Sequence, residues 1–295
     1  MFDLGERIFD SEFLKKLDTI VINVRMVMNT GSGGNRKSRS KGSSVEFSDF
    51  REYSLGDDFR RIDWNAYGRF DRLFVKLFME EREAMVNIFV DSSRSMYFGE
   101  PKKSLSALKL SGALAYLALN NLDRVCLNSL AGTLVKQSSV FSGRGMFRHC
   151  VDFLENMQFE GITDLKSCIK KKEFKGSGVS IVFSDFFTPG GIEDAVKYLL
   201  YKKQDVILVH VLAPEELNPE LEGQIRLLDS ETGEARDISV TPAMLLQYDK
   251  ELSLFMNRIR EFCSRMGAVY IQVSSEEPIE KIVLEEFTRA GIIGK

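Results

Sequence analysis

The stretch that decides the fold is MVNIFVDSSRSMYFG, residues 85–99. Its apolar run, Ile88–Val90, ends abruptly in Asp91, and serines follow at positions 92, 93 and 95. A short continuous apolar run is typical of a strand that is buried on both faces of a sheet. Polar groups directly after such a strand either cap a helix or form a set of oxygen ligands for a hard cation.

Similar apolar strands alternate with helical patterns along most of the chain. We expect strands at 72–80, 87–91, 124–130, 179–185, 205–213 and 268–273, and helices at 104–121, 145–157, 163–174, 191–203, 245–266 and 278–290. This alternation indicates parallel strands that are joined by crossover helices. The sequence therefore predicts an α/β fold, a doubly wound and mostly parallel sheet of about six strands.

Two regions are expected. Residues 81–295 are predicted to form the α/β domain, with a small β-hairpin excursion at about 224–240 that turns near Thr232 and Gly233. Residues 1–80 are predicted to hold an N-terminal helix over 11–29 that Ser11 opens, and then a mobile loop, GSGGNRKSRSKGSS, at 31–44. This loop lacks the second glycine and the following helix that a phosphate-binding loop needs.

The end of the first region, EFSDFREYSLGDDFRRIDWN at 46–65, interleaves charged and aromatic side chains. We predict a packed loop with local ion pairs and aromatic anchors, although exposed pairs stabilise by ~1 kcal/mol at most. The spacing leaves open whether this segment braces the domain or docks a partner. The residues concerned are Arg51, Tyr53, Asp57, Asp58, Arg60, Arg61, Asp63 and Trp64.

Composition excludes several classes of protein. The net charge of −3 over 295 residues gives no general attraction to nucleic acid or to anionic membrane. The four cysteines lack CxxC spacing, which argues against zinc and disulfide frameworks and favours a reducing, cytoplasmic location. No signal peptide is recognisable, and no run of ~18 apolar residues indicates a membrane span.

Five oxygen-bearing side chains follow strands or open a helix of the predicted sheet. Because ligands bind at the carboxyl ends of parallel strands, we expect these side chains to meet at one edge. Hydroxyls and carboxylates without nitrogen or sulfur are typical ligands of Mg²⁺, or of Mn²⁺ or Ca²⁺. Each group could instead cap a helix or turn. The candidate metal ligands are Asp91, Ser93, Ser95, Thr163 and Asp185.

This pattern, D-x-S-x-S followed by Thr163 and Asp185, resembles the metal-ion-dependent adhesion site of von Willebrand factor A domains. The stretch EFSDFREYSLGDDFRRIDWNAYGR closely resembles the signature of the bacterial domain of unknown function 58 family, as do VKLFMEERE, ITDL, FSDFF and LLDSETGE. The resemblance implies a von Willebrand factor A-like domain, direct metal contacts from the three hydroxyls, and water-mediated contacts from both aspartates. It also implies action with a MoxR-type AAA+ ATPase in the assembly or maturation of other proteins.

We therefore expect a non-enzymatic interaction module whose metal ion accepts an Asp or Glu from a protein partner. The alternative is a metal-dependent hydrolase such as a phosphatase, although Ser93 stands where an aspartyl phosphatase needs a second acid. No G-x-S-x-G turn is present, and neither His149 nor His210 is an obvious base. The 31–44 loop gives only weak support for nucleic-acid binding, because no aromatics interrupt its basic residues.

Overall fold

A computed structural model describes residues 8–23, 25–26, 45–54, 56–80, 83–229 and 234–294. These residues divide into two compact units. The larger unit holds the described residues before Thr30 together with those from Ala84 onward, and the smaller unit lies within Gly31–Glu83. The division differs from the expected regions of 1–80 and 81–295, because the N-terminal helix packs within the larger unit.

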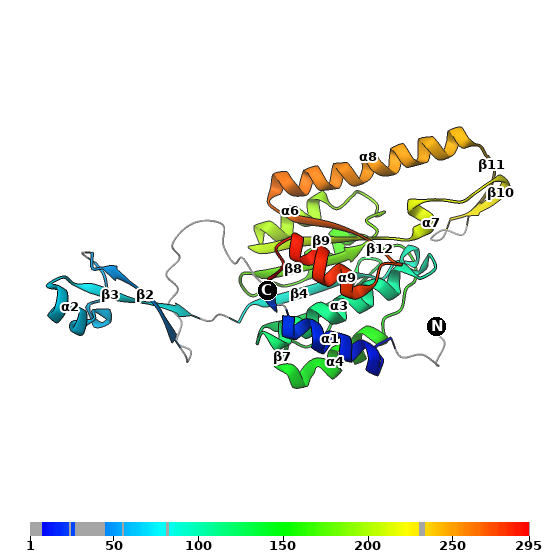
Figure 1. Ribbon diagram of the computed structural model, residues 1–295. Coiled ribbons are helices and arrows are strands. Elements are labelled where there is room, and N and C mark those ends of the chain that lie inside the picture. Colours follow the sequence, from blue (N-terminus) through cyan, green and yellow to red (C-terminus); the bar gives the residue numbers. More distant parts are fainter. Residues whose placement is uncertain are drawn as a thin grey trace. The chain divides into compact units, whose positions relative to one another are not determined.

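A mostly parallel sheet forms the centre of the larger unit, in the order β12-β9-β8-β4-β5-β6 (Figure 1). The short strands β6 and β7 both pair antiparallel with β5, whereas the other pairings are parallel. This sheet confirms the predicted doubly wound α/β fold. Its strands are β4 (Met85–Asp91), β5 (Arg124–Ala131), β6 (Leu134–Gln137), β7 (Phe141–Ser142), β8 (Gly178–Ser184), β9 (Gln204–Leu212) and β12 (Val269–Ser274).

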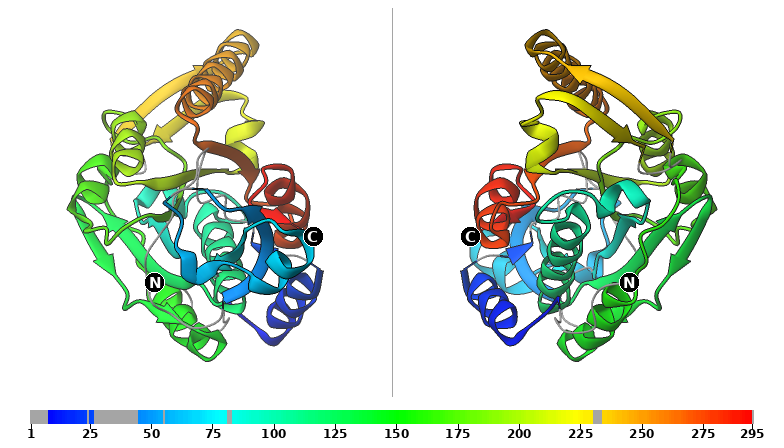
Figure 2. Two further views of the ribbon diagram at one scale, coloured as in Figure 1. Left: turned by 90° about the vertical axis from the view of Figure 1, so that its left-hand side faces the viewer. Right: turned by 90° about the vertical axis from the view of Figure 1, so that its right-hand side faces the viewer.

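Helices cover both faces of this sheet (Figures 1 and 2). The apolar cluster on one face includes side chains of α1 (Ser11–Asn23), α3 (Lys103–Asn120), α4 (Phe147–Glu155), α10 (Phe287–Arg289) and the π-helical turn Ile282–Glu286 that follows α9 (Ile279–Lys281). The cluster on the other face includes side chains of α5 (Leu165–Lys171), α6 (Glu193–Tyr201) and α8 (Pro242–Met266). Because α3 is apolar around most of its circumference, most of its residues are buried.

The N-terminal helix α1 is anchored on α3. Phe9 lies against Gly112, where a β-carbon would come within 2.2 Å of the phenyl ring. Asp10, rather than the expected Ser11, accepts the capping bond, from the amide of Phe13 at 2.7 Å. The helix ends at Asn23 instead of reaching residue 29, and the two-residue strand β1 (Arg25–Met26) then pairs with β13 (Ile293–Gly294).

The smaller unit contains an antiparallel pair of strands, β2 (Val45–Glu52) and β3 (Phe74–Glu80), with the turn η1 (Phe59–Arg61) and helix α2 (Trp64–Phe70) between them. Our placement of the 72–80 strand in the central sheet is therefore wrong. A parallel neighbour of β4 requires a crossover of a dozen or more residues, and the link from Glu80 to Met85 is far too short. The segment predicted as a packed loop at 46–65 also begins with a strand.

The predicted hairpin excursion is present as β10 (Gly223–Leu228) and β11 (Ala235–Val240). It follows the short helix α7 (Pro214–Leu217) and lies beside the N-terminal half of α8, which extends beyond the sheet (Figure 1). The predicted turn at residues 232–233 and the basic loop at 31–44 lie outside the described residues. No helix in the described part of the chain is both long and apolar enough to cross a membrane.

Candidate metal centre

The candidate centre lies where the strand order of the sheet reverses. From β4 the chain proceeds to β5 on one side, whereas the later strands β8, β9 and β12 follow on the other side. Such a switch point leaves a crevice at the carboxyl ends of the two adjacent strands, where ligands of doubly wound folds bind. Asp91 is the last residue of β4, and Asp185 directly follows β8. The register pairs Val90 with Phe183 and so brings the two aspartates to the same edge.

Asp91 is held in a fixed orientation by its neighbours. One carboxylate oxygen accepts a hydrogen bond from the amide of Ser93 at 2.9 Å, and the other accepts one from the hydroxyl of Ser184 at 2.6 Å. Burial, together with the nearby negative charge of Asp185, raises the pKa of Asp91 to about 6. A buried carboxylate beside a second one is an environment that a bound cation would stabilise.

The three hydroxyl candidates converge on Asp91. Ser93 Oγ lies 3.0 Å from Ser95 Oγ, and the Thr163 side chain is close enough to Asp91 to oppose the rise in the pKa of its carboxyl. Two backbone hydrogen bonds join the loop after β4 to the segment before Thr163. Arg94 N donates to Gly161 O at 2.8 Å, and Glu160 N donates to Ser92 O at 2.9 Å. The structure thus places all five predicted side chains at one edge, which is the arrangement that the metal hypothesis requires. Metal binding itself stays a prediction.

The capping alternative applies to only some of these residues. Ser93 precedes the turn η2 (Arg94–Tyr97) but makes no side-chain capping bond. Thr163 does not open α5 as expected, because Asp164 caps this helix through the amide of Ser167 at 3.0 Å. Instead the Thr163 hydroxyl donates to the Leu130 carbonyl at 3.2 Å. Asp185 caps the local turn through the amide of Phe187 at 3.1 Å.

A buried lysine that the sequence analysis did not identify lies at the same edge. Lys103 is the first residue of α3, and its side chain is 0% exposed. Its Nζ donates to Asp185 Oδ2 at 2.7 Å and to Glu216 Oε1 at 2.6 Å. With Asp91 included, this edge of the sheet holds three carboxylates and one ammonium, which leaves two negative charges when all are ionised. The chemistry of this set fits one divalent cation.

Hydroxyls are essential to such a centre. Within the described ranges, no group of three or more His, Cys, Asp and Glu side chains could hold a metal ion alone. His210 supplies no ligand at its Nδ1, which lies 2.7 Å from the hydroxyl of Tyr270. Burial lowers the pKa of His210 to about 4, so it is neutral at physiological pH.

Exposed apolar side chains surround the candidate centre. Phe98, Ile162 and Phe187 are 46%, 40% and 43% exposed. Phe98 follows the serine loop, Ile162 precedes Thr163, and Phe187 lies two residues after Asp185. The rings of Phe98 and Phe187 lie 5.9 Å and 5.8 Å from Lys103 Nζ, which places both beside the buried ion pair. We call these three residues the apolar rim.

The charged segment of the smaller unit is built mainly from turn-stabilising contacts. Asp58 caps η1 through the amide of Arg60 at 3.0 Å, and Asp63 caps α2 through the amide of Asn65 at 2.9 Å. Asp57 accepts two bonds of 2.9 Å from Arg51, and its side chain is only 8% exposed, whereas that of Arg51 is 42% exposed.

The predicted aromatic anchoring of this segment is largely wrong. Phe50, Phe59 and Trp64 are all exposed, whereas Ile62 is buried and bridges to Val75. Tyr53 is half-buried, and the side chain of Arg61 lies outside the described part. The aromatic residues therefore offer apolar surface instead of anchoring the segment.

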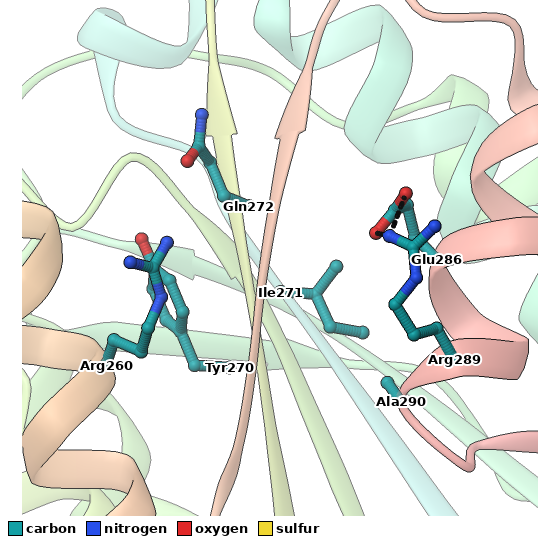
Figure 3. Close-up of a pocket in the computed structure, with 7 residues that line it drawn as sticks. All are labelled: Arg260, Tyr270, Ile271, Gln272, Glu286, Arg289 and Ala290. Carbon is teal, nitrogen blue, oxygen red and sulfur yellow. Dashed lines mark hydrogen bonds and ion pairs between the residues drawn. The ribbon is translucent and has the colours of Figure 1, made fainter.

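A separate pocket of about 360 Å³ lies at the outer edge of the sheet, beside β12 (Figure 3). Arg260, Tyr270 and Gln272 line one part of it, and Glu286 and Arg289 line another. Arg289 is already paired with Glu286, at 2.8 Å to each carboxylate oxygen. None of the five predicted metal ligands lines this pocket, so it is not the candidate centre.

Comparison with known proteins yields a family and several distant relatives. The family model described as "Protein of unknown function DUF58" matches residues 49–253, more than half of the chain. An uncharacterized protein of Mycobacterium tuberculosis (strain ATCC 25618 / H37Rv) is 24% identical over 242 residues, which cover 80% of this chain and 76% of the relative.

Two solved structures are also similar in part. One is the conserved hypothetical protein BatB of Bacteroides thetaiotaomicron, with 17% identity, coverage of 70% of this chain and 98% of that chain, and a TM-score of 0.41. The other is the SpRpn10 VWA domain, with 10% identity, coverage of 70% and 95%, and a TM-score of 0.39.

Proposed function

Because this chain belongs to the DUF58 family, whose description states no function, we propose a function from the geometry of its own sheet edge. The protein is a non-enzymatic interaction module that binds a protein partner through a divalent ion, Mg²⁺ or else Mn²⁺ or Ca²⁺. The observation that carries this proposal is the convergence of two buried carboxylates and three hydroxyls at the switch point between β4 and β8.

The residues have distinct roles in this proposal. Ser93, Ser95 and Thr163 hold the ion directly, while Asp91 and Asp185 hold it through water. Neutral hydroxyls leave much of the positive charge of the ion uncompensated, so the bound ion supplies a position for one further oxygen ligand. An Asp or Glu carboxylate from a partner is the ligand that this charge favours.

The apolar rim supports a protein as the partner. Phe98, Ile162 and Phe187 each expose two fifths or more of their surface around the centre. A small anionic metabolite would leave this surface in water, whereas a protein segment would bury it around the coordinating carboxylate. Central apolar contacts within a polar surround are typical of protein interfaces.

Family resemblance suggests the first partner to test. Proteins of this family are associated with MoxR-type AAA+ ATPases, and we propose that this chain acts with such an ATPase in assembling or maturing other proteins. The support for this partner is kinship alone. The metal-bridge proposal is independent of it, since any partner with an accessible acidic side chain fits the same site.

A metal-dependent phosphatase is the weaker candidate. Ser93 occupies the position of the second acid that an aspartyl phosphatase uses, and His210 is buried among aromatic rings with its Nδ1 against Tyr270. Incubation with phosphate esters and Mg²⁺ is expected to yield no turnover above that of Asp185→Ala. Turnover that Asp185→Ala abolishes would instead establish the enzyme.

The interaction is tested by capturing a purified MoxR-type ATPase from the same organism on the immobilised chain. We expect capture with Mg²⁺, and loss of capture with EDTA or with Asp91→Ala. Asp152→Ala, which removes an exposed acid from α4, is the matched control and retains capture. Equal capture by wild type, Asp91→Ala and EDTA-treated protein would exclude a metal bridge to this partner.

A further inference from the structure

The buried ion pair of Lys103 leads to a further inference, which rests on the proposed metal centre. We propose that Lys103 is a resident cation of this centre. Its ammonium competes with the divalent ion for the Asp185 carboxylate and so lowers the metal affinity, while Glu216 shares the lysine charge and limits this competition. Lys103 and Glu216 together then determine how tightly the centre holds its metal.

The geometry places Lys103 between the two acids. Its Nζ lies 2.7 Å from Asp185 Oδ2 and 2.6 Å from Glu216 Oε1, and both distances are those of charge-assisted hydrogen bonds. Glu216 is itself held in place, because its other carboxylate oxygen accepts a bond of 2.8 Å from the amide of Ala213. The ammonium is thus fixed beside one of the two carboxylates that the proposed metal needs.

Helix stability does not explain a lysine at this position. Lys103 is the first residue of α3, where the positive end of the helix dipole disfavours a cation. Complete burial adds a desolvation cost that only paired acids offset. Asp185 comes from the loop after β8 and Glu216 from α7. The fold therefore brings both acids to the sheet edge, where they neutralise the charge of Lys103.

Net charge and direct competition distinguish two variants. Glu216→Gln lowers the net charge of this set from two negative charges to one, whereas Lys103→Met/Glu216→Gln keeps two, as in wild type, and lacks the ammonium that is paired with Asp185. In Glu216→Gln the whole lysine charge acts on Asp185, and only Asp91 and Asp185 remain to offset both the lysine and the metal ion. In the double variant Lys103→Met/Glu216→Gln the same two acids remain without a competing cation. Because Coulomb energies between charges a few ångströms apart in a protein amount to several kcal/mol, the two effects are measurable.

The test is calorimetric titration of the metal-free chain with Mg²⁺. We expect Glu216→Gln to weaken binding about tenfold and Lys103→Met/Glu216→Gln to bind about tenfold more tightly than wild type. Lys109→Met removes a half-buried lysine further along α3 and is the matched control, with unchanged affinity. Thermal unfolding without metal verifies that each variant folds.

Each outcome decides between the two proposals. If wild type binds Mg²⁺ and both variants bind with the same affinity as wild type, Lys103 is only a structural ion pair and the inference fails. If the double variant binds more weakly than wild type, the inference also fails. If neither wild type nor the double variant binds Mg²⁺, Mn²⁺ or Ca²⁺, the metal centre itself is excluded. Binding by the double variant alone would show that Lys103 blocks the site.

Discussion

The sheet edge at Asp91 and the charged segment of the smaller unit are both rich in acids and bases, yet they use these groups differently. At the sheet edge Asp91, Asp185 and Lys103 are buried, so each charge needs a partner within the fold. In the smaller unit the Arg72–Glu52 pair is exposed on both sides, with side chains 72% and 63% exposed, and such an ion pair adds at most ~1 kcal/mol. The two regions have similar charged residues, and they differ in whether these residues are buried.

The largest effect that we expect comes from the removal of one buried charge at the sheet edge. Asp91→Asn keeps the shape of the side chain but removes its charge, and we expect Mg²⁺ affinity to fall about 10- to 100-fold. Thermal unfolding with and without millimolar Mg²⁺ measures this effect, because a ligand stabilises only the protein that binds it. An undiminished Mg²⁺-dependent rise in melting temperature for Asp91→Asn would contradict the assignment.

His210 shows the effect of burial on stability through pH. The pKa of His210 is lowered to about 4 by burial, with Asp185 opposing the shift and Lys103 adding to it. Because the unfolded chain takes up the proton more readily, the contribution of His210 to stability is complete above about pH 6.5 and decreases as pH falls toward about 4. The expected loss is roughly 3 kcal/mol.

Denaturant unfolding of wild type and His210→Gln across this pH range measures that loss. The difference between the two proteins isolates His210 from Asp91, whose raised pKa acts in the opposite direction over the same range. Identical slopes for wild type and His210→Gln would contradict the buried, neutral histidine.

A smaller effect is expected from a cap in the smaller unit. Asp63 accepts bonds from the amides of Asn65 and Ala66, at 2.9 Å and 3.3 Å, and its removal should cost about 1 kcal/mol of local stability. Hydrogen exchange of the α2 amides in Asp63→Ala measures the loss directly. Asp63→Asn keeps a capping oxygen and is expected to restore most of the protection.

The smallest effect on stability is expected at Trp64, the only tryptophan of the chain, which is 64% exposed. Trp64→Ala should change the unfolding free energy by less than about 0.5 kcal/mol. The indole also reports on docking, because a partner that covers this surface shifts its fluorescence to the blue. A shift on addition of the ATPase would support the docking role of the segment, and an unchanged spectrum would favour a structural one.

Sequence patterns were sufficient for the five parallel strands of the sheet and for the position of the five candidate oxygen groups, whereas metal binding by these groups stays a prediction. The runs NIFVD and SIVFSD each end in an aspartate, and parallel strands carry such ends to a common edge. Lys103 could not be found in this way, because a lysine at a helix start normally lies in water and its partner Glu216 is distant in sequence. The position of β3 was predictable in principle, since too few residues precede β4 for a crossover.

The contact of Phe9 with Gly112 limits how far the chain can be shortened at its N-terminal side. The residues that match the family, 49–253, exclude Phe9, the helix after it and strand β12. A fragment cut at those limits would leave a hollow on α3 open to water and the sheet without its outer strand. We expect it to aggregate, whereas chains that retain residues 8–26 and 254–294 preserve the folding unit. Family boundaries drawn from sequence similarity are therefore too narrow for expressing this domain.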